Sequence, residues 1–287
     1  MLTSPSQLNS YISGMVNSLN GCMVSFDKNL DFVEFLKFRD KAGILTKTTV
    51  LANGGLVLLI SIGSSDITAA QIQNALERGN AEYKIVEFRN APLEHISIPA
   101  SLNTSCLSLI LYRGRLGDLT HFPLPKSHRS VTHITHAQMV RPGVLGEFDA
   151  QISGLRRSRW LIDLCDQDNT LLPGSVALVA NRGMEGEICG FGCIRKEDNQ
   201  AVIGPLYADT DVVARCLVFA LVKSFRPARQ LHVSMSILTQ NTQARCLAEQ
   251  LGLKPYASQN RYYDGLDLKL PNLDHIYGAS HVPMQIL

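Results

Sequence analysis

Charged residues are scarce in this chain. They make up 18% of its 287 residues, against about 25% in an average soluble protein, whereas hydrophobic residues make up 45%. A chain of this composition can bury a large core, which excludes a disordered protein. The 27 Lys+Arg and 25 Asp+Glu leave a formal net charge of +2. Because this charge gives no basic field that could hold a phosphate backbone, we expect no nucleic-acid partner.

Long hydrophobic runs are also missing. The longest apolar run covers residues 54–62, far fewer than the roughly 20 residues that a membrane-spanning helix needs, and it is typical of a buried strand. The first residues show no basic segment followed by an apolar one, which is the pattern of a secretion signal. We therefore expect a cytoplasmic protein with no membrane partner.

Paired cysteine motifs are absent as well. The seven cysteines include no CxxC pair and lie mostly in apolar segments, so we expect buried free thiols in a reducing compartment. His133 and His136 lie three residues apart on a predicted strand and would face opposite sides, so they cannot bind one ion together. The sequence therefore predicts no metal site.

Prolines and basic residues gather at residues 122–130 and predict an interdomain linker. On this basis we expect a divergent α/β domain over residues 1–121 and a second domain over residues 131–287. In the first domain, the pattern predicts strands at 56–62, 83–88 and 106–112, a helix at 68–78 and an amphipathic helix at 30–41.

The second domain has a clearer order of predicted elements. They are a strand at 131–139, helices at 145–152 and 156–165, strands at 176–181, 187–196 and 201–207, a helix at 212–225, a strand at 230–236, a helix at 242–251 and a strand at 261–268. This order predicts an α+β fold with one long crossover helix. The crossover helix has almost no polar face, so a second layer should cover it, supplied by the first domain or by a second copy in a homodimer.

Five segments of the second domain resemble, in order, the motifs of the GNAT acyltransferases, and more closely those of tandem GNAT proteins with a YitH-type C-terminal acetyltransferase domain. They are residues 147–161 (EFD, then GLRR and WL), 190–195 (GFGCIR), 203–209 (IGPLYAD), 241–253 (Asn, Ala, apolar, Gly, apolar) and 261–265 (RYYDG). The resemblance implies a GNAT-like fold in both halves. It also implies transfer of an acetyl or other acyl group from acyl-CoA to a small amine or amino-acid-like acceptor, by direct attack.

This implied chemistry makes three demands. The pyrophosphate needs backbone N–H groups after the fourth strand, the thioester carbonyl needs a backbone N–H on that strand, and the amine needs a base. In the second domain, Asp209 and Asp211 occupy the pyrophosphate loop, where they suit helix capping and repel phosphate. Ala248 stands where the family has a tyrosine that protonates the leaving thiolate.

We therefore place the cofactor, acetyl-CoA or another acyl-CoA, at Gly63, Ser64 and Ser65 of the first domain. These small residues follow an apolar strand and open a helix, so that a backbone can approach phosphate closely. Asn241, at the start of the fourth helix, is either a further cofactor contact or a helix cap.

The catalytic candidates are Tyr207, which ends the central strand beside the splayed position where this fold receives its acyl acceptor, and Asp209, as a base or as a cap. Arg157 and Trp160 share a helical face and, with Tyr207, are candidate substrate contacts. An ion pair of Arg157 with Asp149 or Asp163 would explain that arginine equally well.

The missing phosphate loop and the missing tyrosine also support a rival hypothesis. In it the protein is a catalytically degenerate GNAT relative that acts as a ligand-binding or protein-interaction module. The two halves could in addition be distant repeats, because residues 56–88 and 201–236 share the same succession of apolar strand, acidic or small loop, helix and strand.

Overall fold

The computed structural model describes residues 32–39, 44–51, 56–62, 83–89, 105–121, 133–153, 158–165, 174–183, 186–197, 200–225, 231–264 and 272–279. The chain forms two compact units: unit 1 holds Met1–Leu107 and Gln259–Leu268, and unit 2 holds Ser108–Ser258 and Lys269–Leu287. It passes from one unit to the other within β5 (Ser105–Arg115) and β11 (Lys254–Asp264). The predicted linker at 122–130 lies outside the described residues, so a boundary there stays a prediction.

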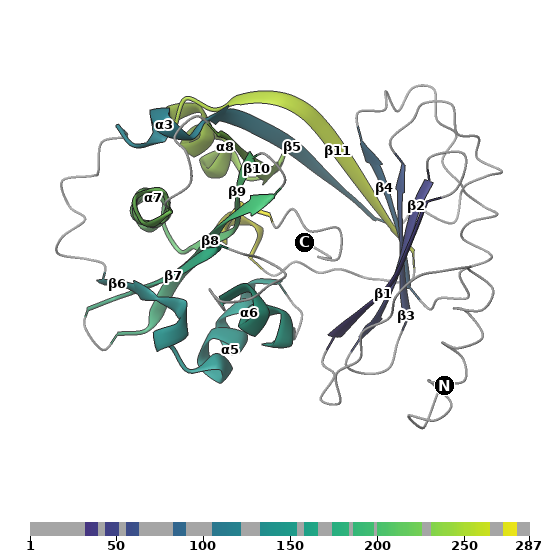
Figure 1. Ribbon diagram of the computed structural model, residues 1–287, viewed down its shortest axis with the longest axis horizontal. Helices are drawn as coiled ribbons and strands as arrows, with labels where there is room; N and C mark the ends of the chain where they lie inside the picture. Colours follow the sequence, from purple (N-terminus) through teal and green to yellow (C-terminus); the bar gives the residue numbers. More distant parts are fainter. Residues whose placement is uncertain are drawn as a thin grey trace. The chain divides into compact units, whose positions relative to one another are not determined.

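Unit 1 is built on a mixed sheet (Figure 1). Its strands are β1 (Phe32–Arg39), β2 (Ile44–Leu51), β3 (Leu56–Ile62), β4 (Tyr83–Arg89) and the last part of β11. β1 pairs antiparallel with β2, β2 antiparallel with β3, β3 parallel with β4, and β4 antiparallel with β11. The strands predicted at 56–62, 83–88 and 106–112 are confirmed as β3, β4 and part of β5.

The amphipathic helix predicted at 30–41 is wrong, because β1 occupies residues 32–39. Its apolar residues are spaced so that they fit one face of a helix, but three of them are phenylalanines, which also suit a strand. Pairing with β2 decides between the two, from Phe32 opposite Leu51 to Arg39 opposite Leu45. The predicted helix at 68–78 lies outside the described residues.

In the described part of unit 2 the strands follow the order β11-β5-β10-β9-β8-β7-β6, where β11 contributes its first part, and a short strand β12 pairs with β9. The further strands are β6 (His133–His136), β7 (Val176–Asn181), β8 (Ile188–Glu197), β9 (Gln200–Ala208), β10 (His232–Leu238) and β12 (Ile276–Gly278). The helices are α3 (Leu116–Leu119), η3 (Ala137–Met139), α5 (Pro142–Ser153), α6 (Ser158–Cys165), α7 (Asp211–Ser224), α8 (Thr242–Gln250) and η4 (Leu273–His275). The predicted order of strands and helices is confirmed up to α8, except that η3 occupies residues 137–139 of the strand predicted at 131–139. The strand predicted at 261–268 corresponds to the end of β11, which belongs to unit 1. The elements α3, η4 and β12 were not predicted.

The crossover helix α7 lies on one face of this sheet, opposite α5 and α6 (Figure 1). It packs on β7, β8 and β9, and it also contacts α3 and α8. Only Lys223 and Ser224 at its end are exposed, so the predicted cover on two sides is present. Part of the second layer comes from unit 2 itself, where the sequence pointed only to the first domain or a second copy.

Glycines on β8 let α7 lie close to the sheet. A Cβ added at Gly190 would come within 2.7 Å of Val213 Cγ1 and 2.8 Å of Leu217 Cδ1, and one at Gly192 within 3.0 Å of Leu221 Cδ1. The motif at 190–195 is therefore a packing surface for the crossover helix.

The two units repeat one topology. In each, three antiparallel strands lead through a crossover into a strand parallel to the third: β1, β2, β3 and β4 in unit 1, and β7, β8, β9 and β10 in unit 2. This agrees with the hypothesis of distant repeats. The units differ where the crossover begins, because β3 and β4 pair up to the final residue of β3, Ile62 opposite Phe88. β9 and β10 pair only up to Ile203 opposite Met235, although β9 continues to Ala208.

The described cysteines of unit 2 are free thiols. Cys165, Cys189, Cys193 and Cys216 are buried, as predicted, whereas Cys246 is exposed. Burial raises the pKa of Cys193 and of Cys165 to about 12. In the described ranges, no three His, Cys, Asp or Glu side chains gather to hold a metal ion. No helix there is long and apolar enough to cross a membrane.

Candidate functional site

The sheet of unit 2 opens between the carboxyl-terminal parts of β9 and β10, and β12 lies in this opening. Ile276 of β12 stands opposite Tyr207 of β9, and Gly278 opposite Leu206. On the other side, the N–H of Ala279 donates to the carbonyl of Ser236 on β10 at 2.7 Å. A segment from the end of the chain therefore bridges the two strands.

A buried arginine supports β9 at the start of the opening. The side chain of Arg195 on β8 is fully buried; its Nε donates to Glu197 Oε1 at 2.7 Å, and its Nη1 donates to the carbonyl of Gly204. Gly204 directly follows Ile203, the last residue of β9 that pairs with β10. Arg195 thus supplies a donor where the ladder to β10 has ended.

Asn241 joins the start of α8 to the segment that enters the opening. Its Oδ1 accepts from the N–H of Ala244 at 2.9 Å, which caps α8. Its Nδ2 lies 3.2, 3.0 and 3.0 Å from the carbonyl oxygens of Leu273, Asp274 and Ile276. The predicted cap is confirmed, and both ends of this buried amide are engaged within unit 2.

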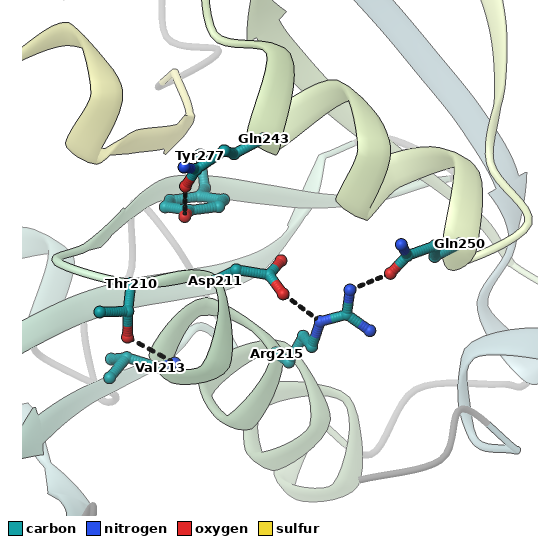
Figure 2. A network of polar contacts seen from close by, with 7 residues as sticks. All are labelled: Thr210, Asp211, Val213, Arg215, Gln243, Gln250 and Tyr277. Carbon is teal, nitrogen blue, oxygen red and sulfur yellow. Dashed lines mark hydrogen bonds and ion pairs between the residues drawn. The ribbon is translucent and has the colours of Figure 1, made fainter. Parts of the chain in front are cut away.

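Side chains at the start of α7 are paired with one another (Figure 2). Thr210 caps α7 by accepting from the N–H of Val213 at 3.4 Å. Asp211 Oδ2 accepts from Arg215 Nε at 2.6 Å, and Arg215 also donates to Gln250 on α8. The start of α7, where the helix dipole would favour a phosphate, therefore carries its own cap and ion pair.

Tyr277 lies close to this helix start (Figure 2). Its hydroxyl donates to Gln243 Oε1 at 2.7 Å, and the residue is 1% exposed. Burial, followed by the carboxylates of Asp211 and Asp209, raises the pKa of Tyr277 to about 12. The strand β12 is therefore fixed through a side chain as well as through its backbone.

Asp209 forms an ion pair with Arg182 of the β7–β8 turn. The pair is partly exposed, since the Arg182 side chain is 63% exposed and that of Asp209 20%. The hydrogen bond from Arg182 to Asp209 raises the pKa of the guanidinium. The other carboxylate oxygen, Oδ1, is buried and has no hydrogen-bond partner in the described part of the chain.

A cavity of about 950 Å³ lies beside Asp209 in unit 2. Its walls include α5, the facing ends of β7 and β8, and residues 272 and 275, which precede β12. The charged and polar lining comprises Thr135, Arg141, Glu147, Gln151, Asn181, Arg182, Glu187, Asp209, Asn272 and His275. Three carboxylates against two guanidiniums suit a small ligand that carries a positive charge or an amine.

The expected acyl-CoA does not fit the opening of unit 2. The backbone of β9 that should meet the thioester pairs with β12, and two carboxylates stand at the start of α7, where the pyrophosphate should lie. The alternative cofactor position, Gly63, Ser64 and Ser65, lies outside the described residues and stays a prediction.

The remaining predicted site residues are placed as follows. Tyr207 is fully buried on β9, with its ring centre 6.5 Å from that of Phe191. Trp160 lies on α6, and Arg157 lies outside the described residues. Asp149 is fully buried and accepts from the hydroxyl of Ser153 at 3.4 Å. The structure thus brings Tyr207 and Asn241 to β12 or the residues before it, and Asp209 to the cavity.

Sequence reasoning missed Arg182 and Tyr277. Arg182 is recognisable once the register of the sheet is known. Gly190 of β8 stands opposite Ala208 of β9, and this pairing brings the β7–β8 turn next to Asp209. Tyr277 had no comparable signal, since it stands in a three-residue strand without alternation.

The comparisons agree with this architecture. Residues 145–278 match the family described as the acetyltransferase (GNAT) domain. A candidate acetyltransferase from Pyrococcus horikoshii is similar in structure, with a TM-score of 0.53 and 15% identity over 84% of this chain and 79% of that chain. A tandem GNAT protein from the clavulanic acid biosynthesis pathway has a TM-score of 0.50 and 10% identity over 91% of this chain and 95% of that chain.

No curated protein sequence matches the chain. At these identities the two solved structures show the fold alone, and the family match covers most of unit 2. The protein has a GNAT-like fold, and its residues 145–278 match the GNAT acetyltransferase domain.

Proposed function

We propose that the protein is an acyl-CoA-dependent N-acyltransferase in which unit 1 holds the acyl-CoA. The GNAT domain supports acyl transfer as the chemistry. The observation that carries the proposal is the repeated topology, because residues 63–65 follow β3 as residues 209–211 follow β9. Since the position in unit 2 is filled by the chain itself, the equivalent position in unit 1 is the better one for the cofactor.

The chemistry of the two loops supports the same assignment. Gly63, Ser64 and Ser65 offer backbone N–H groups with little side-chain bulk, which suits a pyrophosphate. Asp209 and Asp211 offer negative charge. The finer parts of the proposal are an acetyl donor, a small amine or amino-acid-like acceptor, a YitH-type second domain and a cytoplasmic location. Tyr207 as a donor and Asp209 as a base would apply only if the acyl-CoA lay in unit 2 instead.

Thermal unfolding with acetyl-CoA tests this proposal. A ligand at about a hundred times its Kd stabilises the folded state by about 2.7 kcal/mol, which raises the Tm by several degrees. We expect this rise in the natural chain and in Thr210→Ala, but not in Ser64→Asp, which adds a charge at the proposed pyrophosphate position. No rise at millimolar acetyl-CoA would exclude the proposal, and a rise lost only in Thr210→Ala would move the cofactor to unit 2.

A second candidate function is binding of a small amine by unit 2 without acyl transfer. Two observations favour it. Neither unit shows a free strand edge beside its crossover in the described residues, since β3 pairs with β4 up to Ile62 and β9 pairs with β12. In addition, Asp209 lines the cavity of unit 2 together with two further carboxylates, Glu147 and Glu187.

Calorimetric titration with simple primary amines such as ethanolamine, putrescine and lysine tests this second function. We expect Asp209→Asn to weaken binding at least about tenfold, because it removes the charge that faces the cavity. Asp211→Asn is the matched control, since that carboxylate lies two residues away and pairs with Arg215. Equal effects of the two substitutions would argue against a specific role of Asp209.

A further inference from the structure

We propose that residues 272–279 replace the acyl thioester beside the central strand of unit 2, that unit 2 therefore binds no acyl-CoA, and that Asn241 is the latch that holds this segment. The proposal concerns unit 2 alone. It does not depend on whether unit 1 binds a cofactor.

The first argument is the backbone hydrogen bonding of β9 and β10. Their ladder ends at Ile203 opposite Met235, yet β9 continues to Ala208 and β10 to Leu238, and these stretches are buried. Buried N–H and C=O groups require partners. β12 supplies them on both sides, through its pairing with β9 and through the bridge from Ala279 to Ser236. A thioester arm would have to compete with a strand that already satisfies these groups.

The second argument is the burial of the segment. Ile276 is 0% exposed, Tyr277 1% and Ala279 2%, and Tyr277 belongs to the hydrophobic core of unit 2. A Cβ added at Gly278 would lie only 3.2 Å from Leu206 Cβ, so the strand fits closely against β9. This degree of burial is typical of a permanent core element.

The third argument is the latch. The Nδ2 of Asn241 faces the carbonyl oxygens of residues 273, 274 and 276, and these residues lead into β12 and form its first position. The Oδ1 of the same side chain caps α8 through Ala244. One amide thereby couples the formation of α8 to the placement of β12. This gives Asn241 a role in unit 2 that requires no cofactor.

The fourth argument is electrostatic and independent of β12. Asp209 and Asp211 stand at the start of α7, where the helix dipole would otherwise favour an anion, and each is paired with an arginine, Arg182 or Arg215. Each guanidinium is therefore engaged by a carboxylate of the chain and is not offered to a phosphate. Both ends of an acyl-CoA site, thioester and pyrophosphate, are therefore closed by the chain.

Hydrogen exchange on the full chain, with and without 1 mM acetyl-CoA, tests the proposal. We expect slow exchange in residues 272–279, at Ala279 above all, and no change there or in residues 204–208 when acetyl-CoA is added. Rapid exchange in 272–279 without ligand would overturn the proposal, as would a change in exchange at either segment on adding acetyl-CoA. A failure of acetyl-CoA to bind anywhere concerns only the proposed function, because the exchange of residues 272–279 is read in its absence as well.

Asn241→Asp separates the latch from the cap. The carboxylate can still accept from Ala244, but it loses the donor and turns a charge toward three carbonyl oxygens. We expect exchange in residues 272–279 to become about tenfold faster or more, while α8 stays protected. Thr210→Ala, which removes the cap of α7, is the control and should leave residues 272–279 unchanged. Unchanged exchange in Asn241→Asp would overturn the latch.

Discussion

The side-chain amide of Asn241 lies 3.0 Å from the carbonyl oxygen of Ile276 and so joins the first residue before α8 to the strand β12. Its other end caps α8 through Ala244. Asn241 begins the motif at residues 241–253, and the sequence left open whether it contacts a cofactor or caps the helix. In unit 2 it contacts the protein's own chain.

Replacing Asn241 with alanine should cost more than the loss of a cap. A cap alone contributes about 1 kcal/mol, and leaving buried carbonyl groups without a donor adds about 1–3 kcal/mol. We expect the free energy of unfolding to fall by about 2–4 kcal/mol in urea. Thr210→Ala, the control, removes a cap of α7 and should cost about 1 kcal/mol. Equal costs for the two variants would show that the contacts of Asn241 with residues 273–276 contribute nothing.

A methyl group at Gly190 should destabilise unit 2. The added Cβ would overlap side-chain atoms of Val213 and Leu217 on α7, and overpacking of this kind costs about 1–3 kcal/mol. Gly143→Ala is a suitable control, because a Cβ at this position on α5 meets nothing within 4 Å. We expect it to be neutral or slightly stabilising in the same urea titration. A neutral Gly190→Ala would contradict the close packing of α7 on β8.

Arg195→Met should destabilise the protein by about 2–4 kcal/mol. The substitution keeps much of the side-chain volume but leaves the carbonyl of Gly204 and the carboxylate of Glu197 without their donor. The exposed Arg113 on β5 provides the control, and Arg113→Met should cost less than about 1 kcal/mol. Unfolding in urea measures both, and similar costs would mean that Arg195 does not support β9.

The buried thiols predict a loss of stability at alkaline pH. Burial raises the pKa of the Cys193 thiol from 9.0 to about 12, so the unfolded chain loses this proton at a lower pH than the folded one. The stability that the folded chain gains from this protonated, buried thiol is fully present below pH 9, and it is lost as the pH rises from 9 toward 12. Between pH 8 and 10.5 the free energy of unfolding should fall by about 2 kcal/mol less in Cys193→Ala than in the natural chain. The exposed Cys246 is the control, and Cys246→Ala should keep the natural pH dependence.

Most of unit 2 could be predicted because its elements are long and separated by clear punctuation. The crossover helix α7 is one example, with its Thr210 cap and its run of apolar residues. The segment at residues 32–39 could not be assigned correctly, because its apolar spacing suits a helix and a strand equally and only its pairing with β2 decides. A tertiary partner of this kind is invisible in a local pattern.

The absence of a phosphate-binding loop in unit 2 could be predicted from the sequence. The strand that lies in the opening of the sheet could not. The expectation that Asp209 and Asp211 cap α7 is wrong, because Thr210 between them is the cap. Each aspartate pairs with an arginine instead, which the sequence did not predict. Strand β12 could not be predicted, because three residues, Ile276–Gly278, carry no period from which to recognise a strand. Its position follows from long-range pairing with β9.

The number of acetyl-CoA molecules bound per chain, measured by calorimetry on the full chain, tests most directly that unit 1 holds the cofactor while unit 2 is closed by β12. We predict one site per chain, abolished by Ser64→Asp and retained in Thr210→Ala and Asn241→Asp. A stoichiometry of two, or a single site that survives Ser64→Asp and is lost in Thr210→Ala, would contradict this account.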